Sequence, residues 1–149
     1  MGKLIVSTFV AAPLDAVFAI YTDLAKAAER IPEITALEIL TDGSVGKGTR
    51  WRETRLMFKK EAVEEMEITS FDAPKTYTVE ANSHGQRFET LFEFHEEEGG
   101  TRVTWTFWST PLTFGTKLMS PIMKLLFNGI MRKCMQGDLD ALRVVCEKD

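Results

Sequence analysis

The sequence contains few of the residues from which metal and redox sites are built. Only two cysteines and two histidines occur among its 149 residues, and none of them belongs to a CxxC or an HExxH-like spacing. It also contains no P-loop and no GxGxxG, the glycine motifs that bind phosphates and dinucleotides. We therefore expect neither a metal site nor a cofactor.

The two cysteines are also badly placed for a disulfide. Cys134 and Cys146 fall in one predicted helix, where twelve residues at about 1.5 Å each separate them by roughly 18 Å. A disulfide needs Cα atoms within about 7 Å of each other. Both residues are therefore expected to be free thiols, which favours a reducing compartment and hence the cytoplasm.

The chain also lacks an excess of basic residues and a long apolar run. Its net charge is -4 and no basic stripe alternates with aromatic residues, so nucleic-acid binding is not expected. The most apolar stretch, 112–131, contains Lys117, Pro121 and Lys124, which makes it a poor membrane span. The N-terminus leads straight into an alternating strand and does not resemble a signal peptide.

What the chain does contain is enough hydrophobic sequence, 44% of its residues, for a single domain 1–149 with a buried core. Residues 4–11 are typical of a strand. Pro13 suits the first position of a helix, where no N–H partner is needed. Asp23 is expected to cap a second short helix, Leu24–Arg30.

Six further strands are predicted before residue 112. Turn residues separate them, for example Asp42-Gly43, His84-Gly85 and Gly99-Gly100. Because the connections are short, neighbouring strands should pair as antiparallel hairpins, and the absence of intervening helices argues against βαβ units. The predicted strands are 34–41, 48–58, 61–71, 75–83, 86–95 and 101–111.

The last segment changes to helical periodicity. The pattern predicts an amphipathic helix of about 25–30 residues with one buried face, and Pro121 marks either a kink or the start of its main part. The predicted buried stripe is Met119, Met123, Leu126, Ile130, Cys134, Ala141 and Val145. Strands and a terminal helix together indicate an α+β fold.

Several short segments, spread in order along nearly the whole chain, resemble one known superfamily. They are Ala12-Pro13 with Val17-Phe18 and Asp23, Gly46-Lys47-Gly48 before Trp51, Ile68 with Phe71 and Pro74, and residues 99–104. The order of elements is similar to the START-like, helix-grip superfamily, in its polyketide cyclase/dehydratase-like branch.

This resemblance implies a seven-stranded antiparallel sheet wrapped around the long C-terminal helix, with two short helices between strands 1 and 2. It also implies a cavity between the sheet and the C-terminal helix for a small hydrophobic ligand. It implies no catalytic set, because members of the superfamily range from lipid carriers to aromatic cyclases.

Strand alternation predicts which side chains face the concave side of such a sheet. A hairpin at Lys59-Lys60 would create the facing pairs Trp51–Met66, Glu53–Glu64 and Arg55–Ala62. Glu53, Arg55 and Glu64 would then form a polar cluster on an apolar wall. This cluster either serves a ligand or is a structural ion pair. A one-residue error in strand facing would instead turn every side chain outward.

The predicted site combines this cluster with the apolar wall. Glu53, Glu64 and Tyr77 are the candidates for acid–base catalysis, with Arg55 to stabilise developing negative charge. Tyr77 could equally bind a ligand carbonyl, or only pack. The predicted ligand-binding residues are Trp51, Glu53, Arg55, Glu64, Met66, Tyr77, Val79, Phe88, Thr90, Phe92, Trp105, Phe107, Met119, Met123, Leu126 and Ile130.

Three functions remain compatible with the sequence. The first is a binding protein or carrier for a small hydrophobic or amphipathic molecule, because apolar walls with a few convergent polar groups are typical of ligand pockets. The second is a polyketide cyclase/dehydratase-like enzyme. The third is an interaction module with an apolar patch of Trp108, Leu112 and Phe114. Monomer and homodimer both remain open.

Overall fold

The computed structural model describes residues 3–57, 59–83, 85–111 and 121–148, and only the backbone at 57, 83, 111, 121–125 and 127. The elements follow the predicted order, and Pro121 is the first described residue of the last helix. They are β1 (Leu4–Val10), α1 (Leu14–Tyr21), the 3-10 turn η1 (Leu24–Lys26), α2 (Ala27–Arg30), β2 (Ile34–Ile39), β3 (Arg50–Met57), β4 (Lys60–Asp72), β5 (Thr76–Ser83), β6 (Gln86–Glu97), β7 (Gly100–Pro111) and α4 (Pro121–Glu147).

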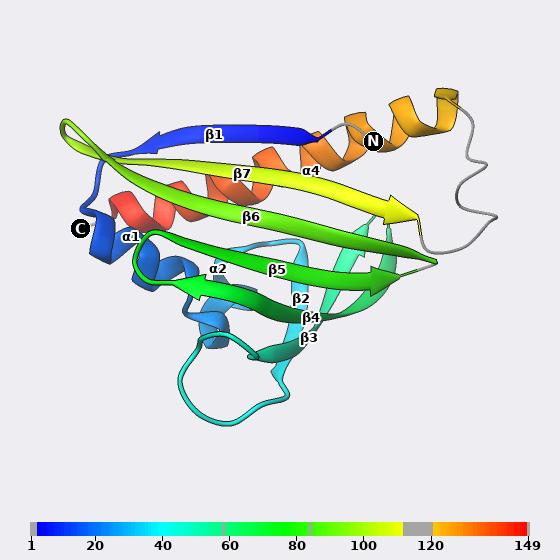
Figure 1. Cartoon of the computed structure of the whole chain (residues 1–149), viewed down its shortest axis with the longest axis horizontal. Coiled ribbons are helices and arrows are strands. Elements are labelled where there is room, and N and C mark those ends of the chain that lie inside the picture. Colours follow the sequence, from blue (N-terminus) through cyan, green and yellow to red (C-terminus); the bar gives the residue numbers. More distant parts are fainter. Residues whose placement is uncertain (1–2, 58, 84, 112–120, 149) are drawn as a thin grey trace.

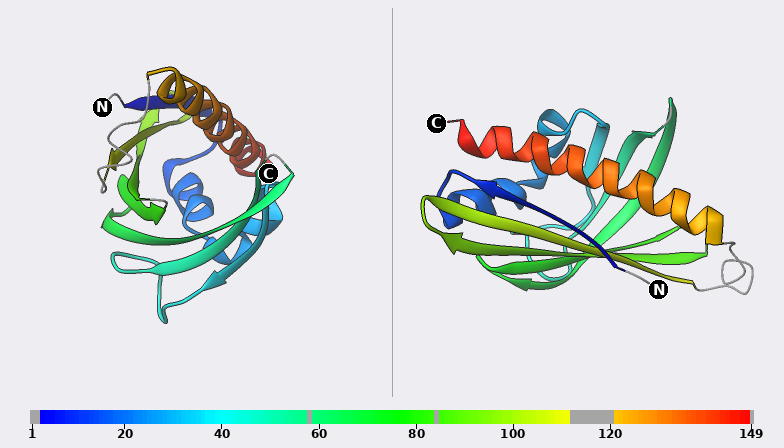
Figure 2. Two further views of the ribbon diagram at one scale, coloured as in Figure 1. Left: turned by 90° about the vertical axis from the view of Figure 1, so that its right-hand side faces the viewer. Right: turned by 90° about the horizontal axis from the view of Figure 1, so that it is seen from above.

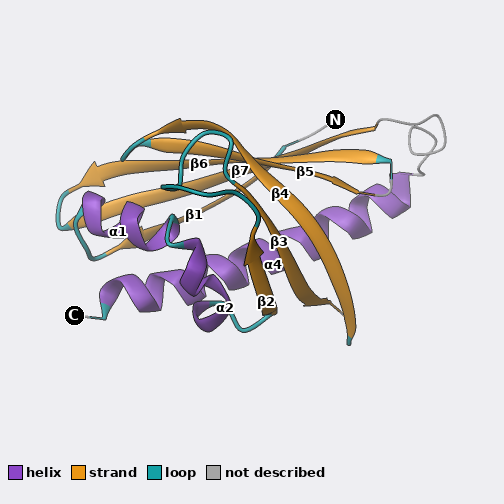
Figure 3. Ribbon diagram, turned by 90° about the horizontal axis from the view of Figure 1, so that it is seen from below, coloured by secondary structure: helices purple, strands orange, loops and turns teal. Residues whose placement is uncertain are grey.

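The strands form one seven-stranded antiparallel sheet in the order β1-β7-β6-β5-β4-β3-β2. Successive hairpins therefore run from β2 to β7, and β1 joins the far edge beside β7 (Figure 1). Seen end on, the sheet curves around α1 while α4 lies across its open side (Figure 2). The short helices and α4 all lie on the concave side (Figure 3). The predicted α+β fold is thereby confirmed.

The predicted register of the β3–β4 hairpin is confirmed. Its facing pairs include Trp51–Met66, Glu53–Glu64 and Arg55–Ala62. Lys59 adopts a left-handed backbone with φ of 65°, as a tight turn requires of one residue. Side chains alternate between the faces of a strand, so this register places the predicted polar cluster on the concave face.

Gly100 shows how closely the β6–β7 hairpin approaches the end of β1. A Cβ atom at this position would overlap the carbonyl oxygen of Val10 and would also meet the ring of Phe9. Thr101, the next residue, is fully buried and donates its hydroxyl to the carbonyl of Ala12. Only glycine allows this close contact. The contact and the Thr101 hydrogen bond hold the start of β7 against the β1–α1 connection.

The core is densest where α1 and the C-terminal half of α4 cover the sheet. Phe94 of β6 is 2% exposed, and Val103, its neighbour on β7, is fully buried. Phe18 of α1 meets Phe94 edge to face, with ring centroids 5.2 Å apart. Val17 and Leu139 complete this layer, and neither is exposed. Burial of such side chains is the main source of stability.

The second short helix differs from its prediction. Residues 24–30 form a 3-10 turn followed by a single α-helical turn. Asp23 makes no capping hydrogen bond. Its carboxylate instead lies 3.6 Å from the guanidinium of Arg30. Asp23 therefore forms an ion pair with Arg30, the last residue of the segment, and does not cap the helix. A 3-10 turn leaves fewer N–H groups to cap than an α-helix.

The predicted buried face of the C-terminal helix is wrong by a rotation about its axis. Leu126 is 57% exposed and Ile130 is 37% exposed. Leu126 precedes Met135 by nine residues, or about two and a half turns, so the two point to opposite sides. The side chains that face the sheet are Met135, Leu139, Leu142 and Cys146. Apolar residues occur on two sides of this helix, and contact with the sheet determines which of the two sides is buried.

Candidate functional site

The middle strands place the predicted wall residues on one continuous concave surface. Phe92 lies in register with Tyr77 on one side and with Trp105 on the other. The rings of Phe92 and Tyr77 stack at 4.5 Å, and those of Phe92 and Trp105 meet edge on at 4.9 Å. Phe88 and Phe107 stack at 5.9 Å. The structure therefore brings together an aromatic wall from β5, β6 and β7.

Burial divides this concave surface into two ends. We call the packed end the layer of Val10, Val17, Phe94, Val103 and Leu139, each with at most 2% exposure. We call the open end the inward residues that remain only half-buried, which are Met66, Val79, Phe88, Thr90 and Phe92. The open end faces the concave side, yet the protein leaves part of its apolar surface uncovered.

The C-terminal helix explains the difference between the two ends. Met135 is the first buried residue among its described side chains, and the described side chains before residue 131 are exposed. Gly129 has no heavy atom within 4 Å of the position that a Cβ would occupy. In Figure 1 the C-terminal half of α4 lies beside α1, whereas its N-terminal half extends toward the far end of the sheet.

The polar cluster exists, and it includes a residue that the sequence analysis missed. Arg55 binds Asp138 of α4 with both of its terminal nitrogens, at 3.1 and 2.9 Å. One of these nitrogens also lies 3.4 Å from Glu53. The Trp51 indole donates to the other oxygen of Glu53 at 3.2 Å. Two carboxylates thus share one guanidinium at the junction of β3 and α4.

Burial controls the electrostatics of this cluster. It raises the pKa of the Asp138 carboxyl, although the hydrogen bond and the charge of Arg55 oppose this rise. For Arg55, burial lowers the pKa, but the carboxylates of Asp138 and Glu53 outweigh burial and raise it. Glu64 faces Glu53 across the β3–β4 ladder. Arg55 therefore shares its charge between the two carboxylates of Asp138 and Glu53.

Asp138 could have been found from the spacing of its neighbours. Met131, Met135, Leu142 and Cys146 define an inward face at steps of three and four residues, and Asp138 lies on that face. A carboxylate in the middle of an apolar helix face needs a partner, because an unpaired buried charge is costly. Arg55 was the strongest candidate on the facing sheet.

The predicted acid–base residues differ in their surroundings. Tyr77 is buried beneath Phe18 and Phe92, and burial raises the pKa of its phenol. A phenol with a raised pKa donates hydrogen bonds at neutral pH and is a poor base. Glu53 is buried within the polar cluster, whereas Glu64 is half-buried.

The cysteines are free, as predicted. Cys134 lies near Arg55 and Asp138, and burial raises the pKa of its thiol. Burial raises the pKa of Cys146 to about 11. Neither thiol is activated as a nucleophile, since activation requires a lowered pKa.

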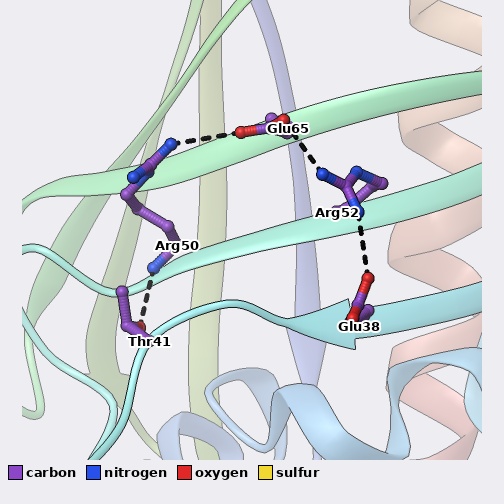
Figure 4. Close-up of polar contacts among 5 residues, drawn as sticks. All are labelled: Glu38, Thr41, Arg50, Arg52 and Glu65. Carbon is purple, nitrogen blue, oxygen red and sulfur yellow. Dashed lines mark hydrogen bonds and ion pairs between the residues drawn. The ribbon is translucent and has the colours of Figure 1, made fainter.

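The outer face of the sheet carries a separate set of charges. Arg50 and Arg52 of β3 both bind Glu65 of β4, and Arg52 also binds Glu38 of β2 (Figure 4). These side chains are about half exposed. Exposed ion pairs of this kind contribute little to stability, and they lie on the opposite face from the polar cluster.

The predicted interaction patch is only partly described. Trp108 has its indole bound to Glu89 at 3.2 Å, and the ammonium of Lys3 lies 5.3 Å from the centre of its ring. The ring is therefore partly covered by a cation. Leu112 and Phe114 lie outside the described residues, as does Met119, and the side chain of Met123 is not described.

Other kinds of site find little support in the described ranges. No group of three His, Cys, Asp or Glu side chains there could hold a metal ion. None of the described helices is long and apolar enough to cross a membrane. A depression of about 470 Å³ lies where α1 begins, beside the tip of the β6–β7 hairpin. It is far along the sheet from the polar cluster and the open end.

The comparisons with known proteins agree with this architecture. The family model described as "Polyketide cyclase / dehydrase and lipid transport" matches residues 1–147. No curated protein matches the chain.

Several solved structures share the fold over nearly the whole chain. A START superfamily protein from Mycobacterium smegmatis has a TM-score of 0.78 at 14% identity, covering 98% of this chain and 97% of its own. The Zhui aromatase/cyclase from Streptomyces sp. R1128 has a TM-score of 0.82 at 14% identity, covering 99% and 94%. A protein of Thermus thermophilus has a TM-score of 0.76 at 22% identity, covering 99% and 100%. The chain thus has the START, or helix-grip, fold.

Proposed function

Because the chain belongs to the polyketide cyclase / dehydrase and lipid transport family, we propose that it binds a small hydrophobic or amphipathic molecule between the sheet and α4. The open end supplies the apolar wall, and the cluster of Glu53, Arg55 and Asp138 lies where a polar end would be met. The remaining wall residues are Trp51, Tyr77, Trp105 and Phe107. Leu126 and Ile130 stay outside this proposal, because the exposed side of α4 carries them.

The observation that carries this proposal is the half-burial of the open end. Phe88, Thr90 and Phe92 share a strand face with Phe94. Phe94 is buried by α1, whereas the other three retain accessible surface on the concave side. Concave apolar surface with a few polar groups at its border is typical of ligand pockets. A ligand in this position would cover surface that the protein leaves open.

Native mass spectrometry of the purified protein tests this proposal directly. We expect an excess of a few hundred daltons over the denatured mass, which organic extraction then identifies. Phe88→Ala should weaken retention of the adduct. Val63→Ala provides the matched control, because Val63 is 60% exposed on the outer face of β4.

Added ligands complete this test. A protein that carries no adduct and binds no hydrophobic molecule would contradict the proposal.

A catalytic role is the second candidate function. A buried carboxyl with a raised pKa beside a guanidinium, as in Asp138 and Arg55, is typical of acid–base sites. Polyketide cyclase or dehydratase-like chemistry would use Asp138 or Glu53 as the proton-transfer group. Once extraction has identified a substrate, Glu53→Gln should abolish turnover and keep affinity. Loss of affinity alone would favour the carrier.

The cellular location and the assembly state remain predictions. The free thiols support a reducing compartment such as the cytoplasm. Equilibrium sedimentation would distinguish monomer from homodimer.

A further inference from the structure

The side of α4 that faces away from the sheet carries a regular stripe of exposed residues. Leu126 and Val144 are each 57% exposed, and Ile130 is 37% exposed. Three further exposed residues lie on the same line of the helix, because the steps between members alternate between four and three residues. This spacing repeats every seven residues and is typical of helices that pack lengthwise against another helix. The stripe is Leu126, Ile130, Lys133, Gly137, Asp140 and Val144.

Gly137, at the middle of this stripe, is not explained by packing within one copy of the chain. No heavy atom of a described neighbour lies within 4 Å of the position that its Cβ would occupy, and α4 runs along the outside of the molecule (Figure 2). A glycine inside a helix costs about 1 kcal/mol relative to alanine. Single exposed apolar residues are common on protein surfaces, but a glycine in the centre of an exposed stripe lets a second helix approach closely.

The stripe is symmetric about Gly137. Ile130 lies seven residues before this glycine and Val144 lies seven residues after it. At a rise of about 1.5 Å per residue, each apolar side chain stands about 10 Å from the glycine along the helix axis. Lys133 and Asp140 occupy the positions between, four residues before the glycine and three residues after it, with opposite charges. One half of the stripe is therefore complementary to the other half.

A second copy of the chain fits this symmetry when the two helices run antiparallel. A two-fold axis at Gly137 places Ile130 of one copy level with Val144 of the other. The same axis places Lys133 of each copy beside Asp140 of the other, so that two pairs of opposite charge form. The apolar and the charged members of the stripe thus find matching partners in a single arrangement.

The charges of the stripe disfavour other occupants. In a parallel pair of helices, Lys133 would face Lys133 and Asp140 would face Asp140, and like charges repel each other. An anionic membrane surface or a nucleic acid would attract Lys133 but repel Asp140, and the chain as a whole carries a net charge of -4. An antiparallel second copy pairs both residues with an opposite charge.

We propose that the outer side of α4 is a homodimer interface, in which the helices of two copies pack antiparallel and cross at Gly137. Lys148 then lies level with Leu126 of the other copy, where its aliphatic stem covers the exposed leucine. One pair of helices is expected to bury less than the roughly 1,200 Å² at which standard interfaces begin. The dimer should therefore be weak, with a Kd of roughly 10 µM to 1 mM. The sheet-facing side of α4, with Asp138, stays free of this contact.

Sedimentation equilibrium at protein concentrations from about 10 µM to about 1 mM tests the dimer. The mass should rise from 16.8 kDa toward twice that value. Lys133→Glu and Asp140→Lys should each raise the Kd at least about 5-fold, because each replaces two attractive pairs with two repulsive ones. The double variant should return the Kd to within about twofold of the wild type, since it only exchanges the charges.

Two exposed valines provide a matched pair for the apolar contact. Val144→Glu should weaken the dimer, because it removes the partner of Ile130. Val63→Glu should leave the dimer unchanged, since Val63 is 60% exposed on the outer face of β4, away from the stripe. An equal effect of both substitutions would contradict the proposed interface.

Cysteine trapping tests the antiparallel register independently of affinity. At the crossing point Gly137 lies next to its own counterpart, and a disulfide needs Cα atoms within about 7 Å. Gly137→Cys should therefore form a covalent dimer under mild oxidation with copper phenanthroline. Gly129→Cys is the matched control, because its Cβ position is equally open but its counterpart lies roughly 24 Å away along the axis. The wild-type protein controls for Cys134 and Cys146.

The outcomes distinguish this dimer from other assemblies. A mass of 16.8 kDa at about 1 mM protein overturns the proposal. A dimer that neither charge change weakens, or that Gly129→Cys traps as fast as Gly137→Cys, overturns the α4 interface. A monomer that binds phosphatidylglycerol vesicles through Lys133 would assign the stripe to a membrane surface and also overturn the proposal. Thermal unfolding of the dilute variants controls for folding, and their melting temperatures should stay near that of the wild type.

Discussion

The packed end and the open end of the concave face are built from the same kind of residue but differ in burial. Along β6, Phe94 lies in the packed end, and Phe92 and Phe88 lie in the open end. All three point to the same side of the sheet. What differs is the covering layer, because the rings of Phe18 and Tyr21 contact Phe94, whereas Phe88 keeps part of its surface accessible. The packed end stabilises the domain, and the open end is where we propose that a ligand binds.

The largest expected effect comes from truncating matched phenylalanines at the two ends. Phe94→Ala should lower the free energy of unfolding by about 3–5 kcal/mol, because it leaves a cavity in a filled layer. Phe88→Ala should cost clearly less, about 1–2 kcal/mol, since its side chain is already partly exposed. Denaturant unfolding of both variants measures the difference. Equal losses would mean that the two ends are packed alike.

The two faces of β3 offer a comparison of charges. Arg55→Met leaves Glu53 and Asp138 buried without their cation, and removing one partner of a buried pair costs about 3–5 kcal/mol. Arg52→Met removes exposed ion pairs and should cost less than about 1 kcal/mol. Chemical denaturation of both variants at low and high salt measures the two losses in the free energy of unfolding. A small cost at Arg55 would show that the cluster is hydrated.

The chain contains two tyrosines, and both lie where the packed end meets the open end. Burial raises the pKa of each phenol above the ordinary value of about 10. The folded state therefore keeps protons that the unfolded state loses above about pH 10. Stability is fully present below that pH and falls as pH rises, by up to about 1.4 kcal/mol per unit for each tyrosine.

Absorbance at the tyrosinate band, followed together with circular dichroism, measures this dependence. Tyrosinate should form only as the protein unfolds. Tyr21→Phe should remove its share of the slope. Tyrosinate formation near pH 10 in the folded protein would indicate that water reaches the phenols freely.

The smallest effects are expected from the two glycines of the C-terminal helix. Neither Gly129 nor Gly137 has a neighbour within 4 Å of a Cβ position, so close packing on a strand does not explain them. Gly129→Ala and Gly137→Ala should each stabilise the helix by about 1 kcal/mol. Thermal unfolding checks both. If Gly129→Ala weakens ligand binding and Gly137→Ala does not, the ligand occupies the space beside Gly129.

The success of the sequence analysis on the sheet has a simple physical basis. Hairpin turns with short connections determine both strand pairing and register. The Lys59-Lys60 turn therefore placed Glu53 opposite Glu64 correctly. The alternation of β6 and β7 likewise identified Phe88, Phe92, Trp105 and Phe107 as inward residues, because the period of a strand leaves only two choices.

The helices were less predictable. The C-terminal helix is apolar on two sides, so its own periodicity could not decide whether Leu126 or Met135 would meet the sheet. Asp138 was missed for the same reason. The first helix begins beside Pro13, as predicted, yet nothing in its local pattern showed that Phe18 and Tyr21 would both meet the ring of Phe94.

The sequence by itself determined the order of the elements, the antiparallel sheet and the strand faces, since these depend on local turns and on alternation. Tertiary structure alone decided the rotation of α4, the pairing of Arg55 with Asp138 across 83 residues, and the line between the packed end and the open end. These features depend on which surfaces meet at long range, and a helix with two apolar sides can meet a sheet in more than one way.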